Sequence, residues 1–243
     1  FDPIGGLNVG TYSIGFSSRG LMWDRMTCAV QEFSRKSMYG LIFNETITDE
    51  RQSPAVIDIL STSTDWLQER LNKMNERQVS AIRHMLEAKC RPAPYILFGP
   101  PGTGKTTTIV ELVVQIYHRN SAARILLTAG SNCCVDKLAH DIYSTGLFEG
   151  KMCRFATSNA KGSPDTKKYF VRETRALFMY RVIVTTNSMT GISGMRSETF
   201  AYVIVDEAGH ACEPEVLMPI NRSSSGGCIV LAGDPKQLGP VIK

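Results

Sequence analysis

The chain has 243 residues, of which 43% are hydrophobic and 21% are charged, and its formal net charge is +4 at pH 7. This length and hydrophobic content suffice for one well-buried core, as in an ordinary globular protein. No stretch approaches the roughly 18 consecutive apolar residues that a membrane-spanning helix requires, which argues against membrane insertion.

The seven cysteines lie mostly in apolar runs and form no C-x-x-C pair, and the four histidines are scattered. An odd count without paired spacing argues against a disulfide framework and against a zinc site, because both need partners at defined spacings. We therefore expect reduced thiols in a cytoplasmic protein. The sequence begins at Phe1, without an initiator methionine or a signal peptide, so we expect it to be part of a longer protein.

Residues 1–65 predict the end of an upstream accessory domain followed by a connector. Tyr12–Phe16 and Tyr39–Phe43 have the pattern of short strands, and Leu21–Phe33 has apolar residues at helical spacing. Thr46–Thr64 is polar and predicts irregular structure. These elements are too few to form a core of their own, so we expect the main domain to span residues 66–243.

Strands and helices alternate from Glu76 onward. Short aliphatic runs predict strands that are covered on both faces, at Tyr95–Phe98, Arg124–Thr128, Arg181–Thr186, Tyr202–Val205 and Cys228–Ala232. Helical spacing predicts helices at Lys105–Tyr117, Val135–Ser144, part of Thr166–Phe178, and Glu213–Met218. This alternation predicts an α/β fold with a parallel sheet flanked by helices, preceded by a small partial N-terminal segment.

The segment Gly99–Thr106 matches the pattern G-x-x-x-x-G-K-[ST] between a predicted strand and a predicted helix. In that context glycines let backbone N–H groups approach phosphates, the Lys105 ammonium reaches the β- and γ-phosphates, and the Thr106 hydroxyl helps to hold Mg²⁺. The nucleotide-binding residues predicted here are Gly99, Pro100, Pro101, Gly102, Thr103, Gly104, Lys105, Thr106 and Thr107.

Residues 146–181 contain eight lysines and arginines against three acidic residues, an excess larger than that of the whole chain. This segment is either a solvated basic loop or a surface near nucleic-acid phosphates.

Asp206-Glu207 ends an apolar strand downstream of the phosphate loop. At this position an aspartate holds Mg²⁺, and the neighbouring glutamate acts as general base on the attacking water. The absence of an Asn-Lys-x-Asp segment argues against guanine nucleotides. More generally, each polar signature follows the C-terminal end of a predicted strand, which is the ligand-binding edge of open α/β sheets.

Three segments together resemble superfamily 1 helicases: Gly99–Thr106, Asp206–Glu215 and Gly233–Pro240. More narrowly, the set resembles the up-frameshift-like RNA helicases. Residues Arg91–Tyr95 and His210 point to the branch named after Moloney leukaemia virus 10 and Armitage. The resemblance implies a RecA-like P-loop NTPase fold, with residues 66–243 as the first helicase motor domain and the second motor domain absent.

The resemblance also implies roles for individual residues. Gln78 would read adenine and thereby make the nucleotide ATP, and Gln237 would sense the γ-phosphate. His210 would donate to the γ-phosphate, a purely structural histidine being the alternative, so that the catalytic set is Glu207, Lys105, Gln237 and His210. Contacts with the backbone of single-stranded RNA are implied for Ser131, Asn132, Thr185 and Thr186.

The implied partners are single-stranded RNA, a second RecA-like domain with its arginine finger, and Argonaute or Piwi proteins of an RNA-silencing pathway in the cytoplasm or in ribonucleoprotein granules. A superfamily 1 DNA helicase remains an alternative, because contacts with the backbone do not read the 2′-hydroxyl. An ATP-dependent RNA clamp with little turnover is another. Without the second domain we expect these residues alone to be nearly inactive.

Overall fold

The computed structural model of the chain describes residues 20–35, 64–88, 90–91, 93–157, 160, 162, 164–234, 236–237 and 239. The predicted strands Tyr12–Phe16 and Tyr39–Phe43 lie outside these residues, as does all of the predicted irregular segment except Thr64. Pro92, Pro235, Leu238 and Pro240, which belong to the motifs quoted above, also lie outside them.

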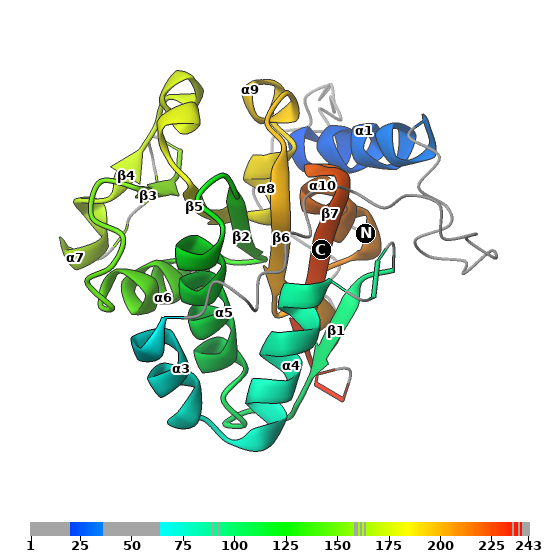
Figure 1. The fold of residues 1–243 in the computed structure, drawn as a ribbon. Coiled ribbons are helices and arrows are strands. Elements are labelled where there is room, and N and C mark those ends of the chain that lie inside the picture. Colours follow the sequence, from blue (N-terminus) through cyan, green and yellow to red (C-terminus); the bar gives the residue numbers. More distant parts are fainter. Residues whose placement is uncertain are drawn as a thin grey trace, which may run out of the picture.

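The centre of the domain is a seven-stranded sheet in which every pair of neighbours is parallel, in the order β1-β7-β6-β2-β5-β3-β4 (Figure 1). This confirms the predicted α/β architecture. The strands are β1 (Tyr95–Phe98), β2 (Ile125–Ala129), β3 (Met152–Phe155), β4 (Phe170–Val171), β5 (Val182–Thr186), β6 (Phe200–Asp206) and β7 (Ser223–Gly233).

Helices cover both faces of the sheet, so the domain has three layers. The first face carries α3 (Asp65–Asn72), α4 (Glu76–Glu87), α5 (Lys105–Arg119) and α6 (Asn132–Tyr143). The second face carries α1 (Leu21–Arg35), α8 (Asn187–Thr190), α9 (Ser193–Arg196) and α10 (Glu213–Ile220). The remaining short elements are α7 (Pro164–Lys167) and the 3₁₀ turns η1 (Thr174–Met179) and η2 (Ala208–His210).

The central strands divide their side chains between the two layers, because successive residues of a strand point to opposite faces. In β2, Ile125 and Leu127 pack in the core beneath α3–α6, whereas Leu126 packs in the core beneath α8 and α9. All five residues of β2 and of β5 are buried, as expected for strands covered on both sides.

Helix α1 is part of this domain, although it precedes the predicted boundary at residue 66. Phe33 is 4% exposed and packs with Val205 and Ile220 in the core of the second face. The Asn221 amide donates to the carbonyl of Ala29 at 2.8 Å, and the buried Arg222 guanidinium pairs with Glu32. Figure 1 shows α1 beside α10 at one end of the sheet.

The structure corrects two predictions about the strands. Strand β1 is not covered on both faces, since Ile96 is 62% and Phe98 is 54% exposed at the edge of the sheet. Strands β3 and β4 were not predicted; β3 is short and is interrupted in the sequence by Arg154, and β4 has two residues.

The helix expected within Thr166–Phe178 is replaced by α7, β4 and η1, none of which is a regular α-helix longer than one turn.

Candidate functional site

The C-terminal ends of the strands form one edge, and the sheet order sorts the predicted site residues along it. Phe98 pairs with Gly233 across β1 and β7, and the Gly99 amide donates to the Gly233 carbonyl at 3.3 Å. Ala129 is level with Asp206 on one side and with Thr186 on the other. The residues predicted to handle ATP therefore follow β1, β7 and β6, and those predicted to contact RNA follow β2 and β5.

The phosphate loop connects β1 to α5 through two glycines in the left-handed region, Gly102 at φ 79° and Gly104 at φ 84°. The Lys105 side chain is 9% exposed, and its Nζ donates to the carbonyl of Gly99 at 2.6 Å and to that of Pro100 at 3.3 Å. The Thr103 hydroxyl closes the loop by donating to Pro100 at 2.7 Å. The ammonium group thus lies inside the loop, where phosphate oxygens would replace carbonyl oxygens as its partners.

Gln78 contacts this loop from the first turn of α4. Its amide nitrogen donates to the Thr103 carbonyl at 3.4 Å, and a Cβ atom on Gly104 would lie 2.4 Å from that same nitrogen. Its amide oxygen accepts from the backbone of Asn75 at 3.3 Å, which completes a capping box at the start of the helix. The structure therefore joins Gln78 to the loop, and the reading of adenine stays a prediction.

Asp206 and Glu207 lie at the end of β6, opposite the loop. Burial raises the pKa of Asp206 to about 6, while the backbone N–H of Glu207 and the charges of Lys105 and Lys137 act to lower it. Glu207 has left-handed backbone at φ 52°, which is uncommon for a residue other than glycine. Its Oε2 is buried without a hydrogen-bond partner among the described residues, and His210 Nδ1 lies 3.7 Å from it.

The turn that carries Gln237 packs directly against the turn after β6. A Cβ atom on Gly233 would lie 3.1 Å from the Gly209 amide nitrogen, and one on Gly209 would lie 3.4 Å from the Asp234 carbonyl oxygen. Asp234 is 6% exposed, and its carboxylate accepts from the backbone N–H of Lys236 at 2.9 Å. The backbone N–H of Gln237 donates to the Asp234 carbonyl at 3.1 Å.

The residues predicted to contact RNA differ in exposure. Ser131 and Asn132 are exposed, and the Ser131 hydroxyl accepts from the backbone N–H of Cys134 at 3.2 Å as the N-cap of α6. Thr186 is 7% exposed and its hydroxyl shares a hydrogen bond with that of Ser188. Thr185 is fully buried and donates its hydroxyl to the carbonyl of Phe155 at 2.8 Å, so its side chain already has an internal partner.

Three further side chains at this edge were not predicted. Lys137 lies close enough to Asp206 to lower the pKa of that carboxyl group. Burial raises the pKa of Glu215, whose Oε1 accepts from the Asn187 amide at 3.4 Å and would lie 3.8 Å from a Cβ atom on Gly130. The sequence signal for Glu215 was its place in the quoted helicase segment, whereas Lys137 is one of several surface lysines and carries no signal of its own.

The chemistry of this edge fits a magnesium–triphosphate group. Thr106 and Asp206 offer hard oxygen ligands, Lys105 offers a cation inside a glycine-rich loop, and the Glu207 carboxylate has a buried oxygen that accepts no hydrogen bond from the described residues. In the described part of the chain, no group of three or more His, Cys, Asp or Glu side chains could hold a metal. Mg²⁺ in proteins is usually bound by one or two carboxylates together with substrate phosphates, and Asp206 could supply one such carboxylate.

Comparison with known proteins adds independent findings. The AAA domain family model matches residues 73–174 and 158–243. The chain is 37% identical to the human RNA helicase Mov10l1 over 219 residues and 42% identical to the mouse RNA helicase Mov10l1 over 184 residues. It is 30% identical over 274 residues to the ATP-dependent helicase NAM7 of Saccharomyces cerevisiae.

These matches cover 80%, 70% and 95% of this chain but only 18%, 15% and 27% of the three relatives, so the chain spans a small part of their length. Among solved structures, the restriction-modification enzyme LlaGI in complex with a DNA substrate mimic has a TM-score of 0.51 at 15% identity. That match covers 68% of this chain and 18% of the enzyme, and it supports the fold. No helix in the described ranges has the length and apolarity needed to cross a bilayer.

Proposed function

The chain belongs to the AAA domain family, within the superfamily 1 branch of up-frameshift-like helicases that holds the Mov10 and Armitage proteins, and on this premise we propose that it is the first motor domain of an ATP-dependent RNA helicase. The proposal assigns to it the binding of ATP with Mg²⁺ and of single-stranded RNA, and the coupling of hydrolysis to movement along RNA. The pathway we propose is RNA silencing, with Argonaute or Piwi proteins as partners in the cytoplasm.

The observation that carries the proposal is the order of loops along the sheet edge. The phosphate loop, the Gln237 turn and the Asp206-Glu207 turn follow three adjacent strands, and the Ser131 and Thr186 loops follow the next two. One continuous edge thus offers phosphate-binding groups at one end and exposed hydroxyl and amide groups at the other.

In this assignment Lys105 binds the β- and γ-phosphates and Glu207 takes a proton from the attacking water. Thr106 and Asp206 would hold Mg²⁺, which would supply positive charge to offset that of the phosphate oxygens. His210, whose Nδ1 lies 3.7 Å from the Glu207 carboxylate, would donate a hydrogen bond to the γ-phosphate. The arginine that completes such sites would come from a second RecA-like domain of the parent protein.

The test measures ATP turnover by the full-length protein with and without single-stranded RNA. We expect RNA to stimulate turnover, and Glu207→Gln to lower the turnover rate by about 100-fold or more while ATP still binds, because only the base is lost. Glu213→Gln is the matched control, since it removes the same charge from an exposed position in α10.

Each alternative has its own outcome. ATP and RNA binding without stimulated turnover would identify an RNA clamp. Backbone contacts at the sheet edge do not read the 2′-hydroxyl, so RNA and DNA of the same sequence are compared as competitors for the full-length protein. Preference for DNA would favour a DNA helicase.

A further inference from the structure

Arg154 is one of the largest fully buried side chains of the domain, and it lies directly beneath the loops that we propose contact RNA. It belongs to β3, a strand that the sequence pattern did not predict. Burying a guanidinium group destabilises the fold unless nearly all of its donors have hydrogen-bond partners. The partners of Arg154 therefore indicate its role.

The guanidinium group of Arg154 uses three separate nitrogens for three partners. Nε donates to the Asp136 carboxylate at 2.8 Å, Nη2 donates to the Asn132 side-chain oxygen at 2.8 Å, and Nη1 donates to the carbonyl of Phe155 at 2.6 Å. Asp136 supplies the counter-charge. Burial lowers the pKa of Arg154, and the hydrogen bond and charge of Asp136 act to raise it.

The carbonyl of Phe155 accepts a second hydrogen bond, from the Thr185 hydroxyl at 2.8 Å. Arg154 therefore connects the start of α6, which follows β2, to the end of β5 through a single carbonyl group. Strand β4 pairs with β3 beside this group, and the centre of its Phe170 ring lies 5.5 Å from the guanidinium carbon of Arg154.

The contact with Asn132 fixes which way its amide faces. A guanidinium group has donors only, so the amide must turn its oxygen toward Arg154 and its NH₂ group away from it. Asn132 is exposed as a residue, whereas Arg154 is 0% exposed. The NH₂ group, which can only donate, is thus held on the outer side of the loop, where a phosphate oxygen would need a donor.

We propose that Arg154 is a positioning residue for RNA binding: it locks the Asn132 amide with its donors toward the RNA backbone and sets the β2 loop against the end of β5. This inference rests on the proposed function, because it presumes that RNA lies on these loops. Arg154 itself does not touch the RNA.

The test compares variants of the full-length protein for affinity to a fluorescent oligouridine, in the presence of a non-hydrolysable ATP analogue. Arg154→Lys keeps the charge that Asp136 needs, but an ammonium group cannot hold three partners in a planar fork. We expect it to weaken RNA binding about tenfold, the effect of losing one hydrogen bond to a charged group, while the KM for ATP at saturating RNA is unchanged.

Asn132→Asp examines the amide directly. The carboxylate keeps an oxygen for Arg154 but replaces the outward NH₂ donor with a negatively charged acceptor, so we expect it to weaken RNA binding at least as much as Arg154→Lys. In the double variant, Arg154→Lys should add little, because the group that it positions is already gone.

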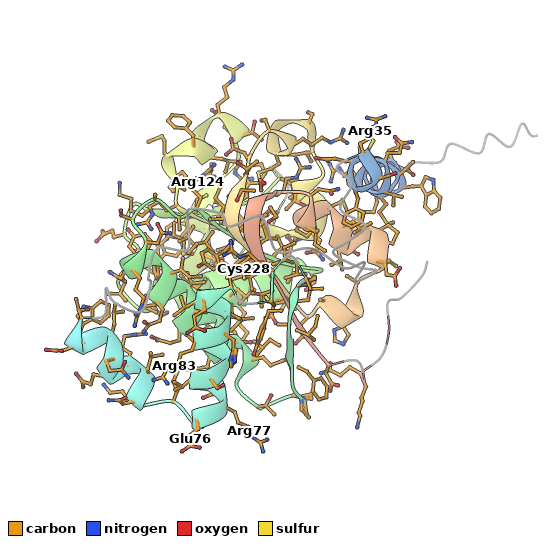
Figure 2. The ribbon with its side chains drawn as sticks, turned by 45° about the vertical axis from the view of Figure 1, so that its right-hand side comes forward. Arg35, Glu76, Arg77, Arg83, Arg124 and Cys228 are labelled. Atoms are coloured by element: carbon orange, nitrogen blue, oxygen red, sulfur yellow. The ribbon has the colours of Figure 1, made fainter. Side chains whose placement is uncertain are left out.

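Arg124→Lys is the matched control. Arg124 precedes β2 and forms a similar set of bonds, to Glu198 at 2.6 Å and to the carbonyls of Leu177 and Tyr180. Figure 2 shows it at the opposite end of the domain from Glu76 and Arg77, at the start of α4. We expect this variant to change stability but not RNA affinity.

Two outcomes would overturn the inference: unchanged RNA affinity in Arg154→Lys, or losses in Arg154→Lys and Asn132→Asp that add fully in the double variant, as a general effect on folding would produce. Both are distinct from failure of the proposed function, in which the unmodified protein would not bind the oligouridine at all.

Discussion

A Cβ atom added to Gly233 would lie 3.1 Å from the backbone nitrogen of Gly209, so the turns after β7 and β6 meet backbone against backbone. The turn that carries Glu207 and the turn that carries Gln237 therefore leave little room for a side chain between them. We therefore expect a change in one turn to displace the other, which would couple the proposed phosphate sensor Gln237 to the proposed general base Glu207.

The first prediction follows from this contact. We expect Gly233→Ala to push the two turns apart, lowering RNA-stimulated ATP turnover several-fold and the free energy of unfolding by about 1–3 kcal/mol, the usual cost of overpacking. Steady-state kinetics and urea unfolding measure the two effects. Gly239→Ala is the control, because a Cβ atom there has no neighbour within 4 Å among the described residues; equal losses in both variants would contradict the prediction.

The Gln78 side chain makes two hydrogen bonds, one within the capping box of α4 and one to the phosphate loop, and substitution can separate their effects. Gln78→Glu keeps an oxygen for the backbone N–H of Asn75 but places a second, negatively charged oxygen toward the Thr103 carbonyl. We therefore expect ATP to bind about tenfold more weakly, roughly 1.4 kcal/mol, with little change in melting temperature. Calorimetric titration with ATP and thermal unfolding give the two values.

The reciprocal variant is Asn75→Ala, which removes the N-cap acceptor of the Gln78 backbone N–H. It should lower the free energy of unfolding by about 1 kcal/mol and affect ATP binding less. If both variants weakened ATP binding to the same degree, Gln78 would act only through the start of α4.

Helix α1 supplies the third prediction. Phe33→Ala removes a ring that is 4% exposed and should lower the free energy of unfolding by about 3–5 kcal/mol, as for other buried aromatic residues. Trp23 lies on the same helix and is 70% exposed, so Trp23→Ala should change stability by no more than about 0.5 kcal/mol. Urea unfolding measures both values. If α1 were only loosely attached to the sheet, neither variant would change the free energy of unfolding appreciably.

The fourth prediction concerns Cys90. A hydrogen bond from Cys228, together with the charges of Arg91 and His84, lowers the pKa of the Cys90 thiol to about 7 despite partial burial. Because the thiolate is the nucleophile, its alkylation by iodoacetamide should rise with pH and reach half its maximal rate near pH 7. Mass spectrometry of the native protein follows this cysteine separately.

Cys228→Ala removes the donor and should raise the pKa of Cys90, so the rate profile should move to higher pH. Figure 2 shows Cys228 within the body of the domain, and it is 2% exposed, so it should not itself be alkylated in the folded protein. A profile of the unmodified protein centred near the ordinary thiol value of 9.0 would contradict the prediction.

The positions of the loops that we expect to bind ATP could be predicted from the sequence because their signals are local. The phosphate loop, Asp206-Glu207 and the Gln237 turn each follow an apolar strand in the chain, and parallel pairing brings such strand ends together. Five strands were predicted for the same reason, with ends within a few residues of those observed except at the start of β7.

The arrangement of the loops after β2 and β5 depends on contacts between residues that are distant in the sequence. Arg154 interrupts the apolar pattern of β3, and its role follows from Asn132 and Asp136, which precede it by 22 and 18 positions. The burial of Thr185 follows from the carbonyl of Phe155, 30 residues away. No periodicity in the sequence reports such pairings. The same holds for α1, whose amphipathic pattern predicted a helix but not the surface against which it packs.

Strand β1 has four residues, lies at the edge of the sheet and pairs, among the described residues, with β7 alone. The phosphate loop therefore follows a strand that is paired on one side, whereas Asp206 ends a strand that is paired on both sides. Because β1 is paired on one side and β6 on both, we expect the loop predicted to bind phosphates to move more easily than the carboxylates of Asp206 and Glu207.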